Sequence, residues 1–284
     1  MPFTVFTGRF APGFGIPDGD SVRFVPDTPG RLFALPRRRF PPKLNPNNGS
    51  ITLRFEGIDA PETKAALPWS ARATEAMLDA LGVADADTAP GWIATTQLGP
   101  NGRPIAFVFP GDAPEPDGGS VWLGPEDVEE SVNWSLLRDG LAYPLFYDTL
   151  FDDLRTAMRG QVDAARGEGR GLWPQDATGG ATWTGDADDL PPIWPKLFRR
   201  VREYVRDETF FDPAAPMRAL PDWIAFEKPE RVALPAEDRF TGFDDLIETT
   251  DDTLRLTVDP ADVVVLSNPT FQSLPMETVR AFAS

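Results

Sequence analysis

Apolar and polar residues alternate over several short segments in the first part of the chain, and apolar residues later recur at helical spacing. Val22 and Phe24 alternate with polar neighbours as in a half-buried strand. Further strands are predicted over residues 51–58, 92–96 and 105–109, and a Gly- and Pro-rich turn joins the last two as a hairpin. Strands followed by helices predict an α+β fold with a small β-barrel.

Four segments have apolar residues at the i, i+3 and i+4 spacing of an amphipathic helix. They are residues 69–81, 126–142, 150–168 and 193–208. The last segment also has a basic face, made of Arg199, Arg200, Arg202 and Arg206. Shorter strand-like pieces follow at 253–258 and 262–266 in a region broken by prolines.

Two stretches of biased composition interrupt these elements. Residues 26–50 are rich in Pro, Asn and Gly, which predicts a loop or an insertion. This loop has no acidic residue from Gly30 to Asn48, and its cationic residues are Arg31, Arg37, Arg38, Arg39 and Lys43. A Gly- and Thr-rich stretch predicts a linker at 177–190, which would separate a domain of residues 1–176 from a C-terminal domain of residues 191–284.

The composition restricts the chemistry that the protein can perform. The 284 residues include no Cys and no His. Disulfides, thiolate nucleophiles, zinc sites built from Cys or His, and imidazole acid–base catalysis are therefore excluded. Any metal ion must be bound by oxygen atoms, which favours Ca²⁺, Mg²⁺ or Mn²⁺.

Charge and hydropathy restrict the partners and the cellular location that are expected. The formal net charge of −17 slows association with a polyanion unless the site itself is locally positive. No apolar run reaches the length of a membrane span, so no membrane partner is expected. The first residues do not read as a signal peptide, so a cytoplasmic location is expected, or a secreted one if a leader has been removed.

The strongest chemical signal lies where the strand over residues 51–58 ends. Arg54 lies on that strand, and Asp59 and Glu62 follow in the turn Asp-Ala-Pro-Glu. Two carboxylates and a guanidinium at one strand end could hold a hard cation and a phosphate together, as metal-assisted phosphodiester hydrolysis requires. Taken singly, the elements also fit plain roles, such as a helix cap for Pro-Glu.

Four segments in fixed order are more specific than any one of them. They are Asp-Gly-Asp-Ser-Val at 18–22, the segment from Arg54 to Thr63, Gly102-Arg103, and the tail from Leu137 to Ala142 with Gly-Leu-Trp at 171–173. Together they resemble the staphylococcal nuclease (thermonuclease) family over roughly residues 1–176. The resemblance implies a five-stranded OB-type barrel with packed helices, followed by a C-terminal extension or small domain of unknown fold.

The resemblance also implies a metal site. Asp20 and Asp59 match the family's two carboxylate ligands, and Ala60 stands where a backbone carbonyl completes the protein ligands. The implied ion is Ca²⁺, with Mg²⁺ or Mn²⁺ as substitutes. The family often has Thr at the position of Ala60, but a carbonyl ligand does not depend on the side chain.

Catalytic roles follow by the same comparison. Glu62 matches the residue that positions or deprotonates the attacking water, and Arg54 and Arg103 match the arginines that grip the scissile phosphate. Phe146 and Tyr147 fall where the family places aromatic residues beside a nucleoside. Stacking on a base and packing in the core are equally compatible with these two positions.

The sequence thus predicts a Ca²⁺-dependent, sugar-non-specific nuclease acting on DNA, RNA or both. The loop arginines Arg37, Arg38 and Arg39 are predicted to bind substrate phosphates, with a solvated charge cluster as the alternative. Two other functions stay open: a non-catalytic OB-type module that binds nucleic acid or protein, and a nuclease regulated by its C-terminal domain and a protein partner. The oligomeric state and the preferred substrate are not predicted.

Overall fold

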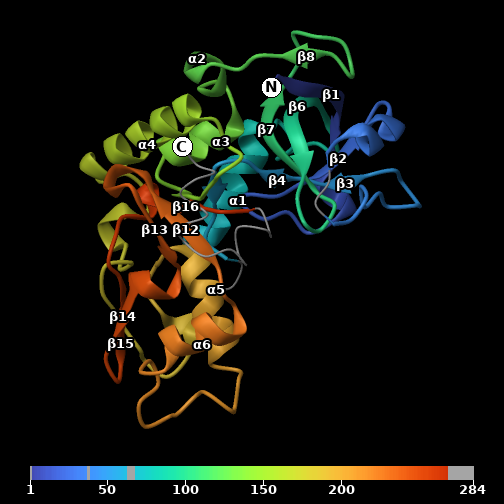
Figure 1. Ribbon diagram of the computed structural model, residues 1–284. Coiled ribbons are helices and arrows are strands. Elements are labelled where there is room, and N and C mark those ends of the chain that lie inside the picture. Colours follow the sequence, from blue (N-terminus) through green and yellow to red (C-terminus); the bar gives the residue numbers. More distant parts are fainter. Residues whose placement is uncertain (1, 37–38, 63–67, 268–284) are drawn as a thin grey trace.

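The computed structural model describes residues 2–36, 39–62 and 68–267 of the chain. A barrel-like sheet forms one part of the molecule, and helices and three smaller sheets lie beside it (Figure 1). The fold is α+β, as the sequence predicts. In the described residues, no helix combines the length and the hydrophobicity that a membrane span requires.

The main sheet closes on itself. Its strands are β1 (Phe3–Phe10), β2 (Arg23–Pro26), β3 (Ile51–Thr52), β4 (Arg54–Phe55), β6 (Ala89–Leu98) and β7 (Pro104–Pro110), with β8 (Ser120–Val121) beside β1. The order is β3-β2-β1-β6-β7-β4. Only Leu53 separates β3 from β4, so the two ends of the sheet are one continuous stretch of chain. This makes the nearly closed five-stranded barrel of an OB fold.

The barrel is filled by aromatic residues at alternate strand positions. Phe6, Phe10, Phe24 and Phe107 are almost completely buried. Strands β6 and β7 form the predicted hairpin. The predicted strand over residues 51–58 is divided into β3, β4 and β5 (Ile58–Asp59), because Gly57 adopts a positive φ of 75° that bends the chain between β4 and β5.

Helices cover one side of the barrel. Their bounds are α1 (Trp69–Ala80), α2 (Pro125–Val128), α3 (Val132–Arg138) and α4 (Asp152–Gly167). The helices predicted at 69–81 and 150–168 are confirmed as α1 and α4. The single helix predicted over 126–142 is wrong, because Ser131 adopts an extended conformation and its side chain accepts a hydrogen bond from the Trp134 amide, starting a new helix.

Within the described residues, the chain after residue 177 forms two α-helices and shares sheets with the rest. The helices are α5 (Pro195–Tyr204) and α6 (Leu220–Glu227). One sheet has the order β10 (Phe146–Tyr147), β16 (Val264–Val265), β12 (Arg231–Leu234) and β13 (Arg239–Gly242), and a second has β11 (Ala181–Thr182), β15 (Thr253–Leu256) and β14 (Ile247–Thr249). A two-stranded sheet joins β5 to β9 (Tyr143–Pro144). Because β16 pairs with β10, the two halves of the sequence meet in one sheet.

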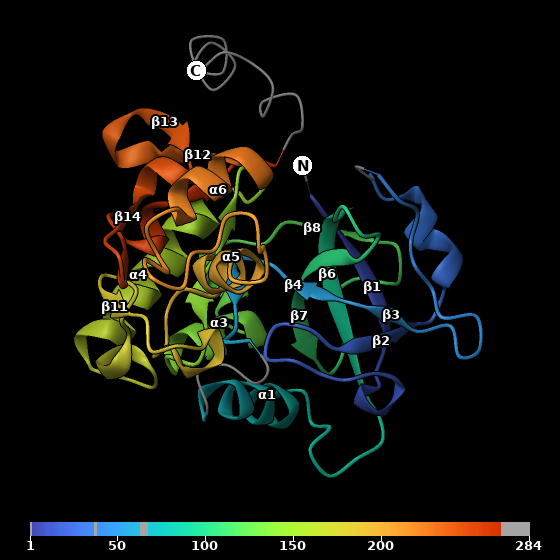
Figure 2. The same cartoon turned by 90° about the horizontal axis from the view of Figure 1, so that it is seen from below.

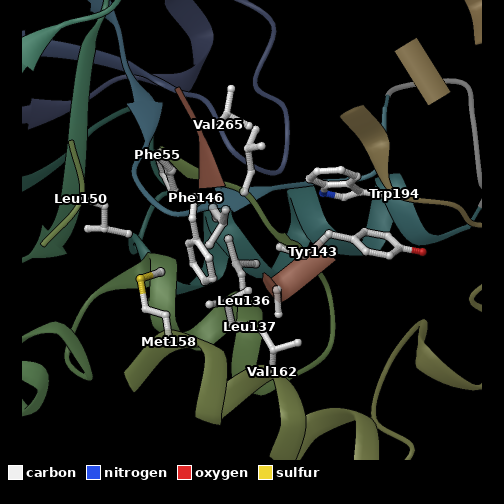
Figure 3. Packing of buried hydrophobic residues seen from close by; sticks show 14 of the residues in the cluster. Phe55, Leu136, Leu137, Tyr143, Phe146, Leu150, Met158, Val162, Trp194 and Val265 are labelled. Carbon is white, nitrogen blue, oxygen red and sulfur yellow. The ribbon is translucent and has the colours of Figure 1, made fainter. Parts of the chain in front are cut away.

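One hydrophobic core spans both halves. In Figure 3, Val265 lies near Phe146 and Trp194 lies beside Tyr143; Phe146 and Tyr143 precede the predicted linker, and all four belong to one buried cluster. Trp194 is completely buried. The predicted linker at 177–190, with a separate domain on each side, stays a prediction. The C-terminal segments pack into the same hydrophobic core as the barrel.

Asn133 ties helix α3 to the barrel. Its side chain is fully buried. Its Oδ1 accepts a hydrogen bond from the Val108 amide at 3.0 Å, and its Nδ2 donates to the carbonyls of Glu56 at 2.9 Å and Ala106 at 3.0 Å. One amide side chain thus satisfies three buried backbone groups between β7 and the turn that leads to β5.

Replacing Asn133 by Leu should destabilise the protein by about 3 kcal/mol. The Val108 amide and the Glu56 carbonyl lose the side-chain partner that Asn133 provides, and the Ala106 carbonyl keeps only its bond from the Glu56 amide. Urea unfolding followed by circular dichroism measures the change. Ser135→Ala on the same helix is the control, because its hydroxyl bonds only to the carbonyl of Val132, one turn away. Equal stability of the two variants would contradict the role given to Asn133.

Candidate active site

Strand β5 presents its carboxylate at the end of the barrel. Asp59 pairs with Tyr143 of β9, and its side chain has no contact with solvent. The bend at Gly57 is tightly packed, because a Cβ there would lie 2.5 Å from the Met158 methyl group. Helix α4 therefore fixes the turn that aims Asp59 back toward β4.

Asp20 reaches the same place from the turn before β2. Gly19 lies so close to α1 that a Cβ would be 2.7 Å from the methyl groups of Ala60 and Ala73. The carbonyl of Asp20 accepts a hydrogen bond from the Phe55 amide at 2.9 Å. The absence of a side chain at Gly19 thus allows Asp20 to sit beside β4 and the residues that follow β5.

Asp20 is close enough to Asp59 and Arg54 for their charges to act on it. Burial raises the pKa of Asp20 to about 7, the Arg54 guanidinium opposes this rise, and the charge of Asp59 adds to it. Asp20 retains some exposure to solvent, unlike Asp59. A carboxyl group whose pKa is raised by burial and by a second carboxylate is typical of a functional site.

The two arginines that the sequence predicted lie together as well. Arg54 lies on β4, which pairs with β7 so that Arg54 is opposite Ile105, two residues beyond Arg103. The Arg54 Nη2 is 3.5 Å from the Asp59 Oδ1. Burial and the positive charge of Arg54 lower the pKa of Arg103. Among the described residues Arg103 has no ion-pair partner, so its guanidinium is available to an anion.

Arg54 and Arg103 line a common pocket. Its volume is about 290 Å³, and Tyr147 and Glu230 also contribute to its wall. A larger groove of about 810 Å³ adjoins it at Arg103. The predicted phosphate-binding arginines thus open onto connected space.

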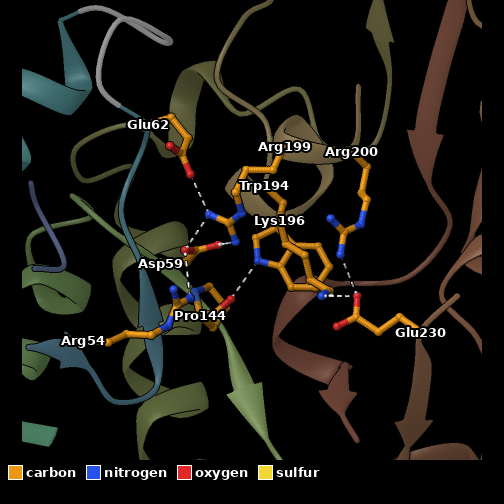
Figure 4. Close-up of polar contacts among 9 residues, drawn as sticks. All are labelled: Arg54, Asp59, Glu62, Pro144, Trp194, Lys196, Arg199, Arg200 and Glu230. Atoms are coloured by element: carbon orange, nitrogen blue, oxygen red, sulfur yellow. Dashed lines mark hydrogen bonds and ion pairs between the residues drawn. The ribbon is translucent and has the colours of Figure 1, made fainter. Parts of the chain in front are cut away.

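A third arginine, from outside the predicted nuclease domain, enters the site. Arg199 of α5 binds Asp59 through two hydrogen bonds, Nη1 to Oδ1 at 3.0 Å and Nη2 to Oδ2 at 2.8 Å. Its Nη1 also binds Glu62 Oε1 at 2.7 Å. Burial would lower the pKa of Arg199, but Asp59 and Glu62 raise it well above its usual value. Figure 4 shows the guanidinium between the two carboxylates.

Helix α5 is held in place independently of Arg199. The Trp194 Nε1 donates to the carbonyl of Pro144 at 2.9 Å, and the Trp194 amide donates to Thr178 Oγ1 at 2.8 Å. Lys196, which is buried, forms an ion pair with Glu230 (Figure 4). Figure 2 shows α5 near the middle of the molecule, beside the part of the barrel that carries β4. Since Pro144 lies on β9, the strand that pairs with β5 also positions α5.

Residues 52–175 match the model of a family described as staphylococcal nuclease homologues. The chain contains an SNase-like domain. No curated protein matches the chain. The matched range covers Arg54, Asp59, Glu62 and Arg103, whereas Asp20 precedes it and Arg199 follows it. The match therefore supports a nuclease-type or nucleic-acid-binding function for this part of the chain.

The aromatic and basic residues predicted to bind substrate fall in different environments. Phe146 is completely buried and packs in the core, whereas Tyr147 lines the pocket that it shares with Arg54 and Arg103. Arg39 lies over the ring of Phe40, 5.1 Å from its centroid, and Phe40 lines the larger groove. Arg37 and Arg38 lie outside the described residues.

The donor set for a cation is present but engaged. Asp20, Asp59 and the carbonyl of Ala60 offer the oxygen atoms that Ca²⁺ prefers. However, Arg199 binds both carboxylate oxygens of Asp59, and in the described part of the chain no cluster of three acidic side chains suits a metal ion. Both oxygens of the Asp59 carboxylate are therefore hydrogen-bonded to Arg199.

Arg199 could be anticipated only in part. The predicted helix over 193–208 is confirmed as α5, and its basic face was visible in the sequence. Which of its four arginines meets Asp59 depends on how Trp194 docks against β9, and no local pattern encodes that contact.

The raised pKa of Asp20 gives a test by pH. The Asp20 carboxyl binds a proton more tightly in the folded than in the unfolded protein. Between about pH 7 and about pH 4 the folded state therefore carries a proton on Asp20 that the unfolded state lacks. Lowering the pH through this range thus makes the contribution of Asp20 to the stability of the fold more favourable. Asp20→Asn removes both the charge and its titration. The free energy of unfolding of the variant should exceed that of the unaltered protein most at about pH 8, and this difference should shrink as the pH falls to about 5.

Urea unfolding at several pH values provides the measurement. Asp85→Asn, at an exposed position in the loop before β6, is the matched control. If the difference between Asp20→Asn and the unaltered protein were constant across this range, the environment assigned to Asp20 would be wrong.

Proposed function

We propose that the protein is a metal-dependent, sugar-non-specific nuclease that hydrolyses phosphodiester bonds of DNA, RNA or both. The observation that carries this proposal is the convergence of Asp20, Asp59 and Glu62 with Arg54 and Arg103 at one end of the barrel. These are the residue types that in-line attack of water on phosphorus requires.

The arginines bind the scissile phosphate. Arg103 has an uncompensated positive charge, and Arg54 shares its charge with Asp59 across 3.5 Å. Two planar guanidiniums can each donate paired N–H groups to phosphate oxygens, which a lysine cannot reproduce. Negative charge that develops on these oxygens in the transition state is thereby stabilised.

Glu62 positions and deprotonates the attacking water. It is partly exposed, with 26% of its side chain accessible, so water can reach it. The water oxygen forms a bond to phosphorus, its proton passes to Glu62, and the bond from phosphorus to the 5′ oxygen breaks. The leaving 5′ oxygen takes up a proton from solvent water. The products bear a 3′-phosphate and a 5′-hydroxyl. With no histidine in the chain, a carboxylate is the natural general base.

Ca²⁺ is proposed as the activating ion, with Mg²⁺ or Mn²⁺ as substitutes. Asp20, Asp59 and the carbonyl of Ala60 would hold it, because they supply hard oxygen ligands at the same end of the barrel. When bound, such an ion supplies positive charge beside the phosphate.

The larger groove gives the substrate a path to these residues. It is lined by the basic side chains of Arg23, Lys43 and Arg103 and by the ring of Phe40, which is 47% exposed. Local positive charge and an aromatic face suit a nucleic-acid strand, and they offset the overall charge of −17. Tyr147 in the smaller pocket is placed to contact a nucleoside.

A binding module without catalysis is the second candidate. It is favoured by one observation: Asp59 is inaccessible to solvent while Arg199 pairs with it. In that case Arg54, Arg103 and the groove would bind nucleic acid, and the bound strand would leave intact.

A cleavage assay separates the two candidates. Plasmid, single-stranded DNA and RNA are incubated with Ca²⁺, with Mg²⁺ or with EDTA. Arg54→Ala and Glu62→Gln should each lower the rate by about a hundred- to ten-thousand-fold, since each removes charge stabilisation or the general base. Arg239→Ala is the control, because Arg239 pairs with Glu237 away from the site. Cleavage that survives EDTA and both substitutions would assign the activity to another site.

Substitutions in the groove should separate binding from chemistry. Replacing Arg23 and Lys43 by Ala should raise KM and leave kcat nearly unchanged, since these residues bind phosphates remote from the scissile bond. The dependence of log K on log salt should become shallower by about one unit for each lost phosphate contact. Fluorescence anisotropy with labelled oligonucleotides gives the salt slope. A changed kcat with an unchanged KM and slope would contradict the proposed path.

A further inference from the structure

We propose that Arg199 and a divalent cation compete for Asp59, so that the cation enters this site only in exchange for the Arg199 ion pair. This inference rests on the proposed function for the identity of the cation-binding residues. It assigns a role to a residue outside the range matched by the family model, residues 52–175.

Both carboxylate oxygens of Asp59 are already engaged by guanidinium groups. Arg199 donates to Oδ1 and Oδ2 at 3.0 and 2.8 Å, and Arg54 approaches Oδ1 at 3.5 Å. Asp59 is completely shielded from solvent, whereas 32% of the Arg199 side chain is accessible. Arg199 is therefore the member of this ion pair whose side chain reaches solvent, and a cation arriving from solvent meets Arg199 before Asp59.

The same guanidinium restrains the residue that would position water. Its Nη1 binds Glu62 Oε1 at 2.7 Å while it also binds Asp59. Withdrawal of one side chain would free a metal ligand and the proposed general base together. Cation entry and the release of Glu62 are thereby one event.

The exchange requires a change of side-chain rotamer and no opening of the fold. Helix α5 is anchored by Trp194, which is fully buried, and by the Lys196–Glu230 ion pair. None of these contacts involves Arg199. With the helix fixed, the partly exposed Arg199 side chain can turn toward solvent or toward the pocket that Arg54 and Arg103 line, while its Cα stays in place.

Calcium binding measured without nucleic acid tests the competition. Isothermal titration calorimetry is performed on the full chain and on Arg199→Gln. Arg199→Gln should bind Ca²⁺ about tenfold more tightly than the unaltered protein, a typical size for coupling between two binding events. Arg202→Gln is the matched control, since Arg202 lies on the same helix and its nearest carboxylate is Asp188, at 3.7 Å. Its affinity should equal that of the unaltered protein.

The location of the added binding is tested by Asp59→Asn in the Arg199→Gln background, which should abolish the gain. Equal affinity of Arg199→Gln and the unaltered protein, including no binding by either, would overturn the proposal. So would a gain that survives Asp59→Asn. None of these measurements depends on cleavage, so a failure of the nuclease assay and a failure of this inference are distinguishable.

Loss of the ion pair is expected to lower stability, so thermal unfolding is recorded as well. Ca²⁺ should raise the unfolding midpoint of Arg199→Gln more than that of the unaltered protein, because stabilisation of the native state by a ligand grows with the logarithm of its affinity. If Arg199→Gln does not fold even with Ca²⁺, Arg199→Lys decides. A lysine keeps the charge but cannot donate paired N–H groups to both carboxylate oxygens, so its Ca²⁺ affinity should exceed that of the unaltered protein. An unchanged affinity in Arg199→Lys would then overturn the proposal.

Discussion

The ion pair between Arg199 and Asp59 is the interaction on which the organisation of the site depends. A buried carboxylate without a partner is strongly unfavourable, and removing one member of a buried pair typically costs about 3–5 kcal/mol. Asp59 has no solvent contact, and its closest partner is the Arg199 guanidinium, with Arg54 farther away at 3.5 Å. The SNase-like domain therefore relies on a side chain from the later part of the chain to neutralise one of its own site carboxylates.

Strand β9 makes this dependence possible, because it contacts both β5 and the start of α5. Strand β9 pairs with β5, which carries Asp59, and its Pro144 carbonyl accepts the Trp194 hydrogen bond that anchors α5. A few residues later, β10 pairs with β16 near the end of the described chain. The C-terminal segments are consequently packed into the same core as the barrel. This rigidity favours a side-chain exchange over the separation of domains as the way to expose Asp59.

Local patterns in the sequence predicted the barrel, most helices and the residues that meet at its end. Asp20, Arg54, Asp59 and Arg103 were predicted as site residues from four ordered motifs that resemble the staphylococcal nuclease family. The turn, strand and hairpin that carry these four residues are encoded by neighbouring residues. Contacts over long sequence separations could not be found in this way. Phe146 and Tyr147 illustrate the limit: adjacent aromatic residues on one strand face opposite sides, and only the packing of α3, α4 and β16 decides which one is buried.

Charge balance at the site explains how an acidic protein could bind a polyanion. Asp20, Asp59 and Glu62 face Arg54, Arg103 and Arg199, so the site is close to neutral before any cation arrives, and a pKa of about 7 at Asp20 makes it slightly positive at neutral pH. A divalent ion that replaced Arg199 at Asp59 would add two positive charges without removing the arginine from the neighbourhood. The freed guanidinium would then join Arg54 and Arg103 in attracting a phosphate. Cation and substrate would therefore favour each other's binding. The cation at Asp59 would leave the Arg199 charge free for the phosphate, and a phosphate bound to Arg199 would leave the Asp59 charge free for the cation.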